Sequence, residues 1–123
     1  MQVFNLDGVT PSQNKTDRMH WTKKGDLKDE WYWLVKAAAG VRGEKQEEPV
    51  RMHIIRVSKR LIDDSNVPAG CKYLIDAFVK FGHAKDDSHR WMQTTFEQRK
   101  CKTGEAPHME ITLAPLRHRE ETE

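Results

Sequence analysis

Two pairs of adjacent aspartates are the residues whose type and spacing best suit chemistry. Asp63 and Asp64 stand in one short polar segment, and Asp86 and Asp87 stand in another, after the next helical pattern. Mg²⁺ prefers oxygen ligands and keeps several waters, so two or three carboxylates from separate loops can bind it together with phosphate oxygens. A metal held in this way polarises a phosphodiester and activates water. The two pairs therefore predict a metal site.

A simpler interpretation of the same aspartates stays open. Asp63 and Asp64 can form a polar loop that favours the start of the following helix, because a helix N-terminus attracts negative charge. Asp86 and Asp87 can form a turn before a strand. The pattern alone is compatible with both interpretations.

Basic residues border both acidic pairs. The chain has 123 residues and a net charge of +2, which is too mild to indicate nucleic-acid binding without a clustered distribution. Arg56, Lys59 and Arg60 precede the first pair, and Arg90 follows the second. We expect them to contact phosphates without reading sequence, the alternative being a solvated strand end.

The elements that must position these residues follow from hydrophobic periodicity. Apolar residues recur at helical spacing in two segments, 26–39, which ends before Gly40, and 68–82. Strands are predicted in four segments, 2–6 at a sheet edge, 50–58 in a central position, 91–98 and 108–113, whereas 8–14 reads as an irregular loop without a helix. This order predicts one α+β domain over residues 1–123, a two-layer sandwich with a mixed β-sheet and two main helices packed on one face. We expect the charged tail, 117–123, to be frayed.

The sequence argues against several other functions. Its two cysteines, Cys71 and Cys101, lack CxxC spacing, and its histidines lack the paired helical spacing of zinc enzymes. A glycine-rich phosphate loop is missing, so we expect no organic cofactor. No leader or membrane-length apolar run occurs, which predicts a cytoplasmic protein without membrane contact.

The segment 61–91, LIDDSNVPAGCKYLIDAFVKFGHAKDDSHRW, carries a resemblance to a known family. It resembles the core of RusA-like Holliday junction resolvases of phages and prophages, in which a D-x-D-N motif opens a helix with a lysine and a "DAL" segment, followed by "DDS". The matching positions are Asp63, Asn66, Lys72, Asp76-Ala77-Phe78 and Asp86-Asp87-Ser88. Upstream, Pro11-Ser12, Asn14 and Arg18-Met19-His20-Trp21 resemble the amino-terminal signature of the phage branch.

The resemblance implies an Mg²⁺-dependent endonuclease, with Mn²⁺ as a substitute, that resolves four-way DNA junctions as a homodimer. Asp63 and Asp87 would hold the metal, with Asp64 or Asp86 as a further ligand. Lys72 would stabilise charge on the scissile phosphate, the alternative being an exposed ion pair with Asp76.

One position departs from the family pattern, because the second acid of D-x-D-N is Ser65 here. A neutral hydroxyl is a weaker ligand than a carboxylate, and the adjacent Asp64 can replace it only if the loop bends. A junction-binding protein with impaired cleavage is therefore the second hypothesis, and a scaffold for protein contacts is the third.

Residues before the first predicted helix could reach DNA. Arg18 and His20 are the candidates there, and Trp21 is a further one. Trp31 and Trp33 can instead belong to the core or to a dimer interface, as can Trp21.

Overall fold

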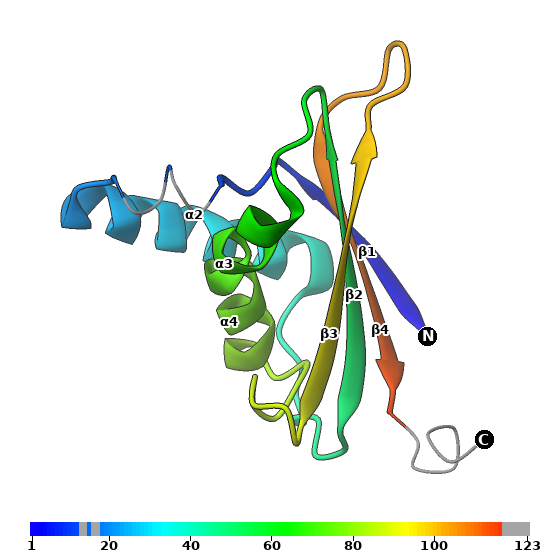
Figure 1. The fold of residues 1–123 in the computed structure, drawn as a ribbon. Coiled ribbons are helices and arrows are strands. Elements are labelled where there is room, and N and C mark those ends of the chain that lie inside the picture. The colour runs from blue at the N-terminus through cyan, green and yellow to red at the C-terminus, as the bar shows by residue number, and fades with distance from the viewer. Residues whose placement is uncertain (13–14, 16–17, 117–123) are drawn as a thin grey trace.

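A computed structural model describes residues 1–12, 15 and 18–116 of the chain (Figure 1). Asn14 and the predicted frayed tail, 117–123, lie outside the described residues. Four strands form one mixed sheet in the order β1-β4-β2-β3, with β2 and β3 parallel and the other neighbours antiparallel. Their bounds are Gln2–Asp7 for β1, Val50–Ser58 for β2, Met92–Lys100 for β3 and His108–Pro115 for β4.

The helical elements lie on one side of this sheet (Figure 1). They are α2 (Trp21–Ala39), the 3₁₀ turn η1 (Asp64–Asn66), α3 (Val67–Gly70) and α4 (Lys72–Lys80). Two main helices, α2 and α4, thus pack on a mixed sheet. The predicted α+β class is confirmed, as are the edge position of β1 and the central position of β2.

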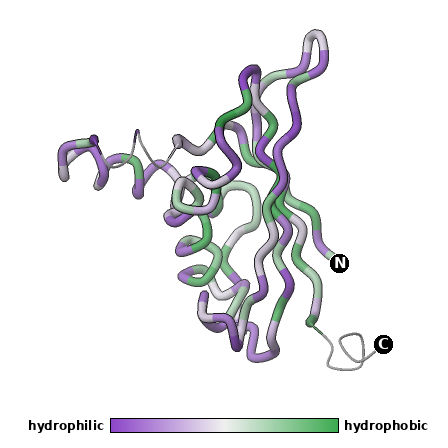
Figure 2. The backbone as a smooth tube through the Cα atoms, viewed as in Figure 1, coloured by the Kyte–Doolittle hydropathy of each residue, from purple (hydrophilic) through white to green (hydrophobic). Residues whose placement is uncertain are grey.

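Alternating side chains make the contact between the two layers. Met109, Ile111 and Leu113 of β4 are buried, while the residues between them are partly exposed. On α4, Leu74 and Phe78 are four apart and fully buried, as helical spacing requires. Burying side chains of this size contributes about 1.5–3 kcal/mol each. Figure 2 shows the hydrophobic stretches where the helices meet the sheet.

The strand order requires a crossing near one end of the sheet. β3 lies at the edge beside β2, yet the next strand, β4, lies on the other side of β2, between β2 and β1. The connecting segment, 101–107, passes over the end of β2, where the Cys101 backbone N–H donates to the Ser58 carbonyl at 2.9 Å. The C-terminal ends of β2 and β3 therefore share one end of the molecule with this loop.

Helix α2 begins at Trp21, five residues earlier than the hydrophobic pattern predicted. His20 caps it, because its Nδ1 accepts a hydrogen bond from the Thr22 backbone N–H at 3.3 Å. None of residues 21–30 is buried. The turn before residue 26 has no apolar stripe, so periodicity could not reveal it.

The second predicted helix is divided at Cys71, which separates α3 from α4. Close packing accompanies the break, since a Cβ added to Gly70 would lie 2.0 Å from the Pro11 carbonyl oxygen. The neighbouring Thr10 is 1% exposed. The segment after β1 is therefore held tightly against α3, and it is irregular, as predicted, over its described residues 8–12.

Candidate active site and nucleic-acid interface

The first aspartate pair lies where the chain enters η1. Asp63 has extended backbone, with φ −61° and ψ 134°, and Asp64 begins the 3₁₀ turn, whose Asn66 backbone N–H donates to the Asp63 carbonyl at 2.9 Å. Asp63, Asp64 and Ser65 are exposed. The loop does bend at Asp64, which was the condition for Asp64 to replace the acid missing at Ser65.

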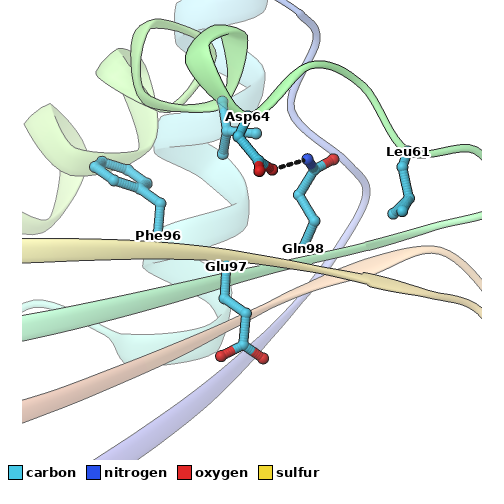
Figure 3. A pocket seen from close by; sticks show the side chains of 6 residues that line it. Leu61, Asp64, Phe96, Glu97 and Gln98 are labelled. Atoms are coloured by element: carbon cyan, nitrogen blue, oxygen red, sulfur yellow. Dashed lines mark hydrogen bonds between the residues drawn. The ribbon is translucent and has the colours of Figure 1, made fainter.

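Gln98 of β3 holds this bent segment (Figure 3). Its Nε2 donates to the Asp64 Oδ1 at 2.5 Å and to the Ile62 carbonyl at 2.7 Å, while its Oε1 accepts from the Ile62 backbone N–H at 3.0 Å. The Asp64 carboxylate consequently points toward β3. It borders a surface cavity of about 470 Å³, whose other lining residues are Leu61, Val67, Phe96, Glu97 and Gln98.

The second aspartate pair meets a residue of α4. The Asp87 backbone N–H donates to the Asp86 Oδ1 at 2.7 Å. The pKa of the Asp87 carboxyl is raised, first by a hydrogen bond with Asp86, then by slight burial and by the negative charges of Asp86 and Asp76. Asp76, Asp86 and Asp87 therefore form an acid cluster in which like charges act on one another.

Lys72 starts α4 and is exposed. Lys72 and Asp76 are four residues apart, so they share one face of the helix. In the described part of the chain, however, the two do not form an ion pair within 4.0 Å. The face that bears the acid cluster thus also presents Lys72.

The predicted metal ligands do not all meet. Among the residues that the structure describes, no three of Asp63, Asp64, Asp86 and Asp87 have ligand oxygens within 4.8 Å of one another. The charges of Asp86 and Asp76 act on Asp87, but the ligand oxygens of these three do not all lie within 4.8 Å of one another either, and Asp64 is held by Gln98. Asp76 was predicted only as a motif residue, and its i+4 position after Lys72 was the signal that could have placed it in the site.

Arg56 does not have the position expected for a phosphate contact. It is 8% exposed on β2; its Nε donates to the Thr10 carbonyl at 3.0 Å and its Nη1 to the Ser58 Oγ at 2.9 Å. Burial lowers the pKa of its guanidinium. The alternative, a solvated strand end, does not hold for Arg56 either, because the segment after β1 covers it and Arg56 donates to the backbone of that segment.

The remaining cations expected to bind DNA are exposed and lie in three places. Lys59 and Arg60 follow β2, and Lys59 borders a hollow of about 500 Å³ beside the 101–107 loop. Arg90 follows the acid cluster, with its guanidinium carbon 5.1 Å from the centroid of the Trp91 ring. Arg18 and His20 precede α2. The structure does not gather them into one patch.

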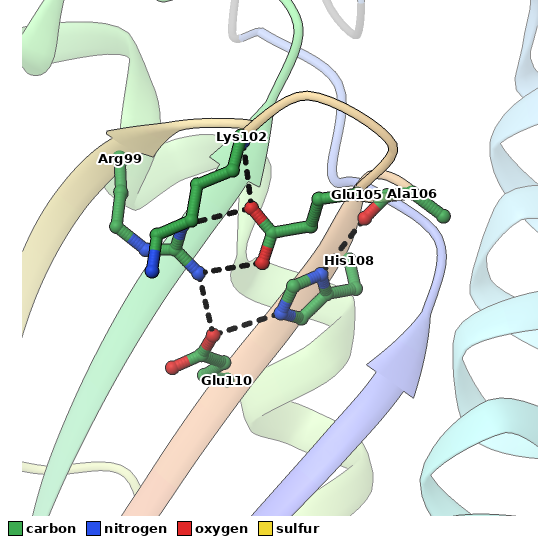
Figure 4. A network of polar contacts seen from close by, with 6 residues as sticks. All are labelled: Arg99, Lys102, Glu105, Ala106, His108 and Glu110. Carbon is green, nitrogen blue, oxygen red and sulfur yellow. Dashed lines mark hydrogen bonds and ion pairs between the residues drawn. The ribbon is translucent and has the colours of Figure 1, made fainter.

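A polar network on the sheet face away from the helices was not predicted (Figure 4). Arg99 donates to both carboxylate oxygens of Glu105 at 2.9 Å and to Glu110 at 3.1 Å, and His108 Nε2 lies 2.8 Å from Glu110. These four residues are called the Arg99 network. Among the described residues, Glu105, His108 and Glu110 are the group whose ligand atoms lie within 4.8 Å of one another, but the Arg99 guanidinium already pairs with both carboxylates.

The pKa values within the Arg99 network follow its ion pairs. Hydrogen bonds from Arg99 and from the Lys102 backbone lower the pKa of Glu105 to about 2. The pKa of Glu110 is lowered by its hydrogen bond with His108 and by Arg99. The pKa of His108 is raised by its hydrogen bond to the Ala106 carbonyl and by Glu110. The network therefore holds the 101–107 loop to β3 and β4.

Comparisons with known proteins add no relative. No protein-family model matches the chain, and no curated protein matches it either. Among the described residues, no helix is long and apolar enough to cross a membrane.

Proposed function

We propose that this protein is a divalent-metal-dependent DNA endonuclease of the RusA-like type that acts on four-way junctions. The observation that carries the proposal is the acid cluster, three carboxylates on and beside α4, with Lys72 on the same helix face. The D-x-D-N-like segment and the DDS segment supply the family resemblance. The two lines of argument meet at Asp87.

The donor set suits a hard divalent cation. Asp76, Asp86 and Asp87 offer carboxylate oxygens, which in this structure do not all lie within 4.8 Å of one another, so a cation would have to draw them together. The pKa of Asp87 is raised by its hydrogen bond with Asp86, then by slight burial and by the charges of Asp86 and Asp76, and a cation would offset those charges. Mg²⁺ or Mn²⁺ bound there would supply Lewis-acid assistance to phosphodiester hydrolysis. Asp63 is exposed at the start of η1 and would complete the set.

The protein's own residues have distinct parts in this proposal. Lys72 shares a face of α4 with Asp76, and from there it would offset charge that develops on the scissile phosphate. Lys59 and Arg60 would contact phosphates at the end of β2, and Arg90 would do so next to Asp87. Arg56 has no part in DNA contact here, because it is buried.

A junction-binding protein with impaired cleavage is the second candidate. The observation that favours it is the hydrogen bond from Gln98 to Asp64, which turns the Asp64 carboxylate toward β3. Ser65 supplies no charge in its place. In that case the chain would bind branched DNA and cleave it slowly. Both candidates place the protein in the cytoplasm, where its DNA substrate would be found.

A homodimer is part of the proposal, because a two-fold junction suits a two-fold enzyme. Trp31 is 3% exposed and belongs to the core of the protomer, but Trp33 is 68% exposed and Trp21 is 74% exposed. Light scattering with and without junction DNA tests this part, and a monomer mass in both conditions would contradict it.

The deciding experiment uses a labelled four-way junction and a duplex of the same sequence, each with EDTA, Mg²⁺ or Mn²⁺. The endonuclease proposal predicts junction-selective, metal-dependent nicks. Junction-selective binding without nicks would favour the second candidate. Neither binding nor nicks would overturn both.

A further inference from the structure

The first ten residues of α2 form a helical arm. Figure 1 shows these turns extending past α3 and α4, away from the sheet, and Figure 2 shows them as largely hydrophilic. No side chain of residues 21–30 is buried, whereas Trp31 and Val35 are 3% and 0% exposed. Packing of an apolar face normally stabilises a helix in a protein, and in this arm that packing is limited to Leu27, which is partly buried against the core. Packing within the described chain therefore does not account for the charged residues of the arm.

Three lysines follow one side of α2. Lys24, Lys28, Tyr32 and Lys36 recur every four residues, so they follow one side of the helix. Asp26 and Glu30, also four apart, fall on the opposite side together with Lys23, and Asp29 lies between the two rows. The side that bears Lys24, Lys28 and Lys36 therefore carries a net positive charge.

Lys80 of α4 joins the same row. Its Nζ lies 5.1 Å from the centroid of the Tyr32 ring, and the Nζ of Lys28 lies 5.4 Å from that centroid. Among the described residues, neither ammonium is within 4.0 Å of a carboxylate. Two like charges held at one aromatic ring repel each other, and an anion placed between them relieves the repulsion. Lys24, Lys28, Lys36 and Lys80 around Tyr32 are called the lysine stripe.

The lysine stripe continues toward the acid cluster. Lys80 is four residues after Asp76 on α4, so the two share a helix face. Asp87 in turn feels the charge of Asp76. A polyanion that followed the stripe from the arm would pass Lys80 and arrive beside the carboxylates and Lys72.

We propose that the lysine stripe binds the phosphodiester backbone of one arm of a branched DNA and leads it to the acid cluster. This inference rests on the proposed function, because it gives that site its substrate path. The regular spacing of the lysines suits successive phosphates, which carry one charge each. Such contacts fix the position of the DNA and carry no sequence information.

Binding of a labelled four-way junction in EDTA, measured over a range of salt concentrations, tests the stripe. The variant Lys28→Gln/Lys80→Gln removes the two charges beside Tyr32. The matched control, Lys23→Gln/Arg51→Gln, removes two exposed positive charges outside the stripe, one on another side of α2 and one on the far face of the sheet. Each phosphate contact contributes about 0.9 to the slope of log K against log salt, so the stripe variant should lose about 1.8 of that slope.

The outcomes separate this inference from the proposed function. A stripe variant with a reduced slope, beside a control like wild type, supports the inference whether or not wild type cleaves. Equal slopes in both variants overturn it, and junction cleavage by wild type would then leave the endonuclease proposal standing. Wild type that neither binds nor cleaves the junction overturns both. Melting curves show that each variant is folded.

Discussion

Two acidic regions of this molecule differ in what balances their charge. In the Arg99 network, Glu105 and Glu110 share a guanidinium, and the pKa of each is lowered. In the acid cluster, Asp87 has Asp86 and Asp76 as its charged neighbours, and its pKa is raised. Ionised carboxylates thus stabilise the folded protein in the Arg99 network and destabilise it in the acid cluster. Such a cost is typical of a functional site, since stability alone would favour neutral residues there.

The largest expected effect is on junction cleavage, which should need the acid cluster but not the Arg99 network. Asp87→Asn removes a proposed metal ligand and should reduce junction cleavage to background, while binding stays intact or becomes tighter because DNA is repelled less. Asp63→Asn should do the same. Glu105→Gln is the matched control, as it neutralises one acid of the Arg99 network and should cleave at the wild-type rate. Wild-type cleavage by Asp87→Asn would remove that residue from the site.

The next effect concerns the cation beside the acid cluster. Lys72→Ala should slow cleavage on the order of 10²-fold, comparable to losing one contact that stabilises transition-state charge. Single-turnover cleavage at saturating enzyme measures this rate apart from binding. Lys45→Ala, an exposed lysine in the loop before β2, serves as the control and should retain the wild-type rate. Equal rates for the two variants would make Lys72 an ordinary surface residue.

Neutralising one carboxylate should change the melting temperature in opposite directions in the two regions. At pH 7 in EDTA, Glu105→Gln should lower the melting temperature by a few degrees, whereas Asp87→Asn should raise it slightly. The lowered pKa of Glu105 gives stability that is present above about pH 4.5 and is lost as the pH falls toward 2. The raised pKa of Asp87 has the opposite effect, because its penalty is present at neutral pH and disappears below its usual value of 3.8.

Melting curves between pH 3 and pH 7 measure both effects. The two variants should approach wild type at the acidic end of this range. A destabilised Asp87→Asn at pH 7 would show that the acid cluster supports the fold, and the contrast with the Arg99 network would then be lost.

The smallest expected effect comes from restoring the family pattern. Ser65→Asp adds a carboxylate in the 3₁₀ turn η1, so Mg²⁺ should bind more tightly and cleavage should rise at low metal concentration. Without metal, the added charge should make the variant slightly less stable than wild type, and Mg²⁺ should reverse the loss by mass action. Titration of Mg²⁺ against melting temperature and cleavage checks both statements. If neither changes, position 65 lies outside any metal site.

Periodicity predicted the elements that have one apolar face and missed what lacks one. The alternation in β4 and the four-residue spacing in α4 place those elements correctly, because burial selects both patterns. The arm of α2 has no buried residue, so its start was placed too late. The break at Cys71 lies beside the close approach of Pro11 to Gly70, a tertiary contact that no local pattern encodes.

The sequence predicted contacts between site residues that are close in the chain better than contacts between residues that are far apart in it. The pairing of Asp86 with Asp87 is a matter of adjacency, and the addition of Asp76 follows from α4 and the loop after it. The Arg99 network joins residues up to eleven positions apart across a loop, and Arg56 meets Thr10 forty-six positions away. Such partners depend on the strand order, which the sequence did not reveal.

The strand order also decides when the protein can fold during synthesis. β1 is made first, but its hydrogen-bonding neighbour is β4, the last strand of the described chain. A nascent chain that ends before His108 can pair β2 with β3, yet β1 has no strand beside it and the apolar face of the sheet stays incomplete. Long-range pairing of this kind slows folding and leaves strand edges open to aggregation. A premature stop codon between residues 101 and 108 should therefore yield an insoluble fragment, even though it spares every residue of the acid cluster.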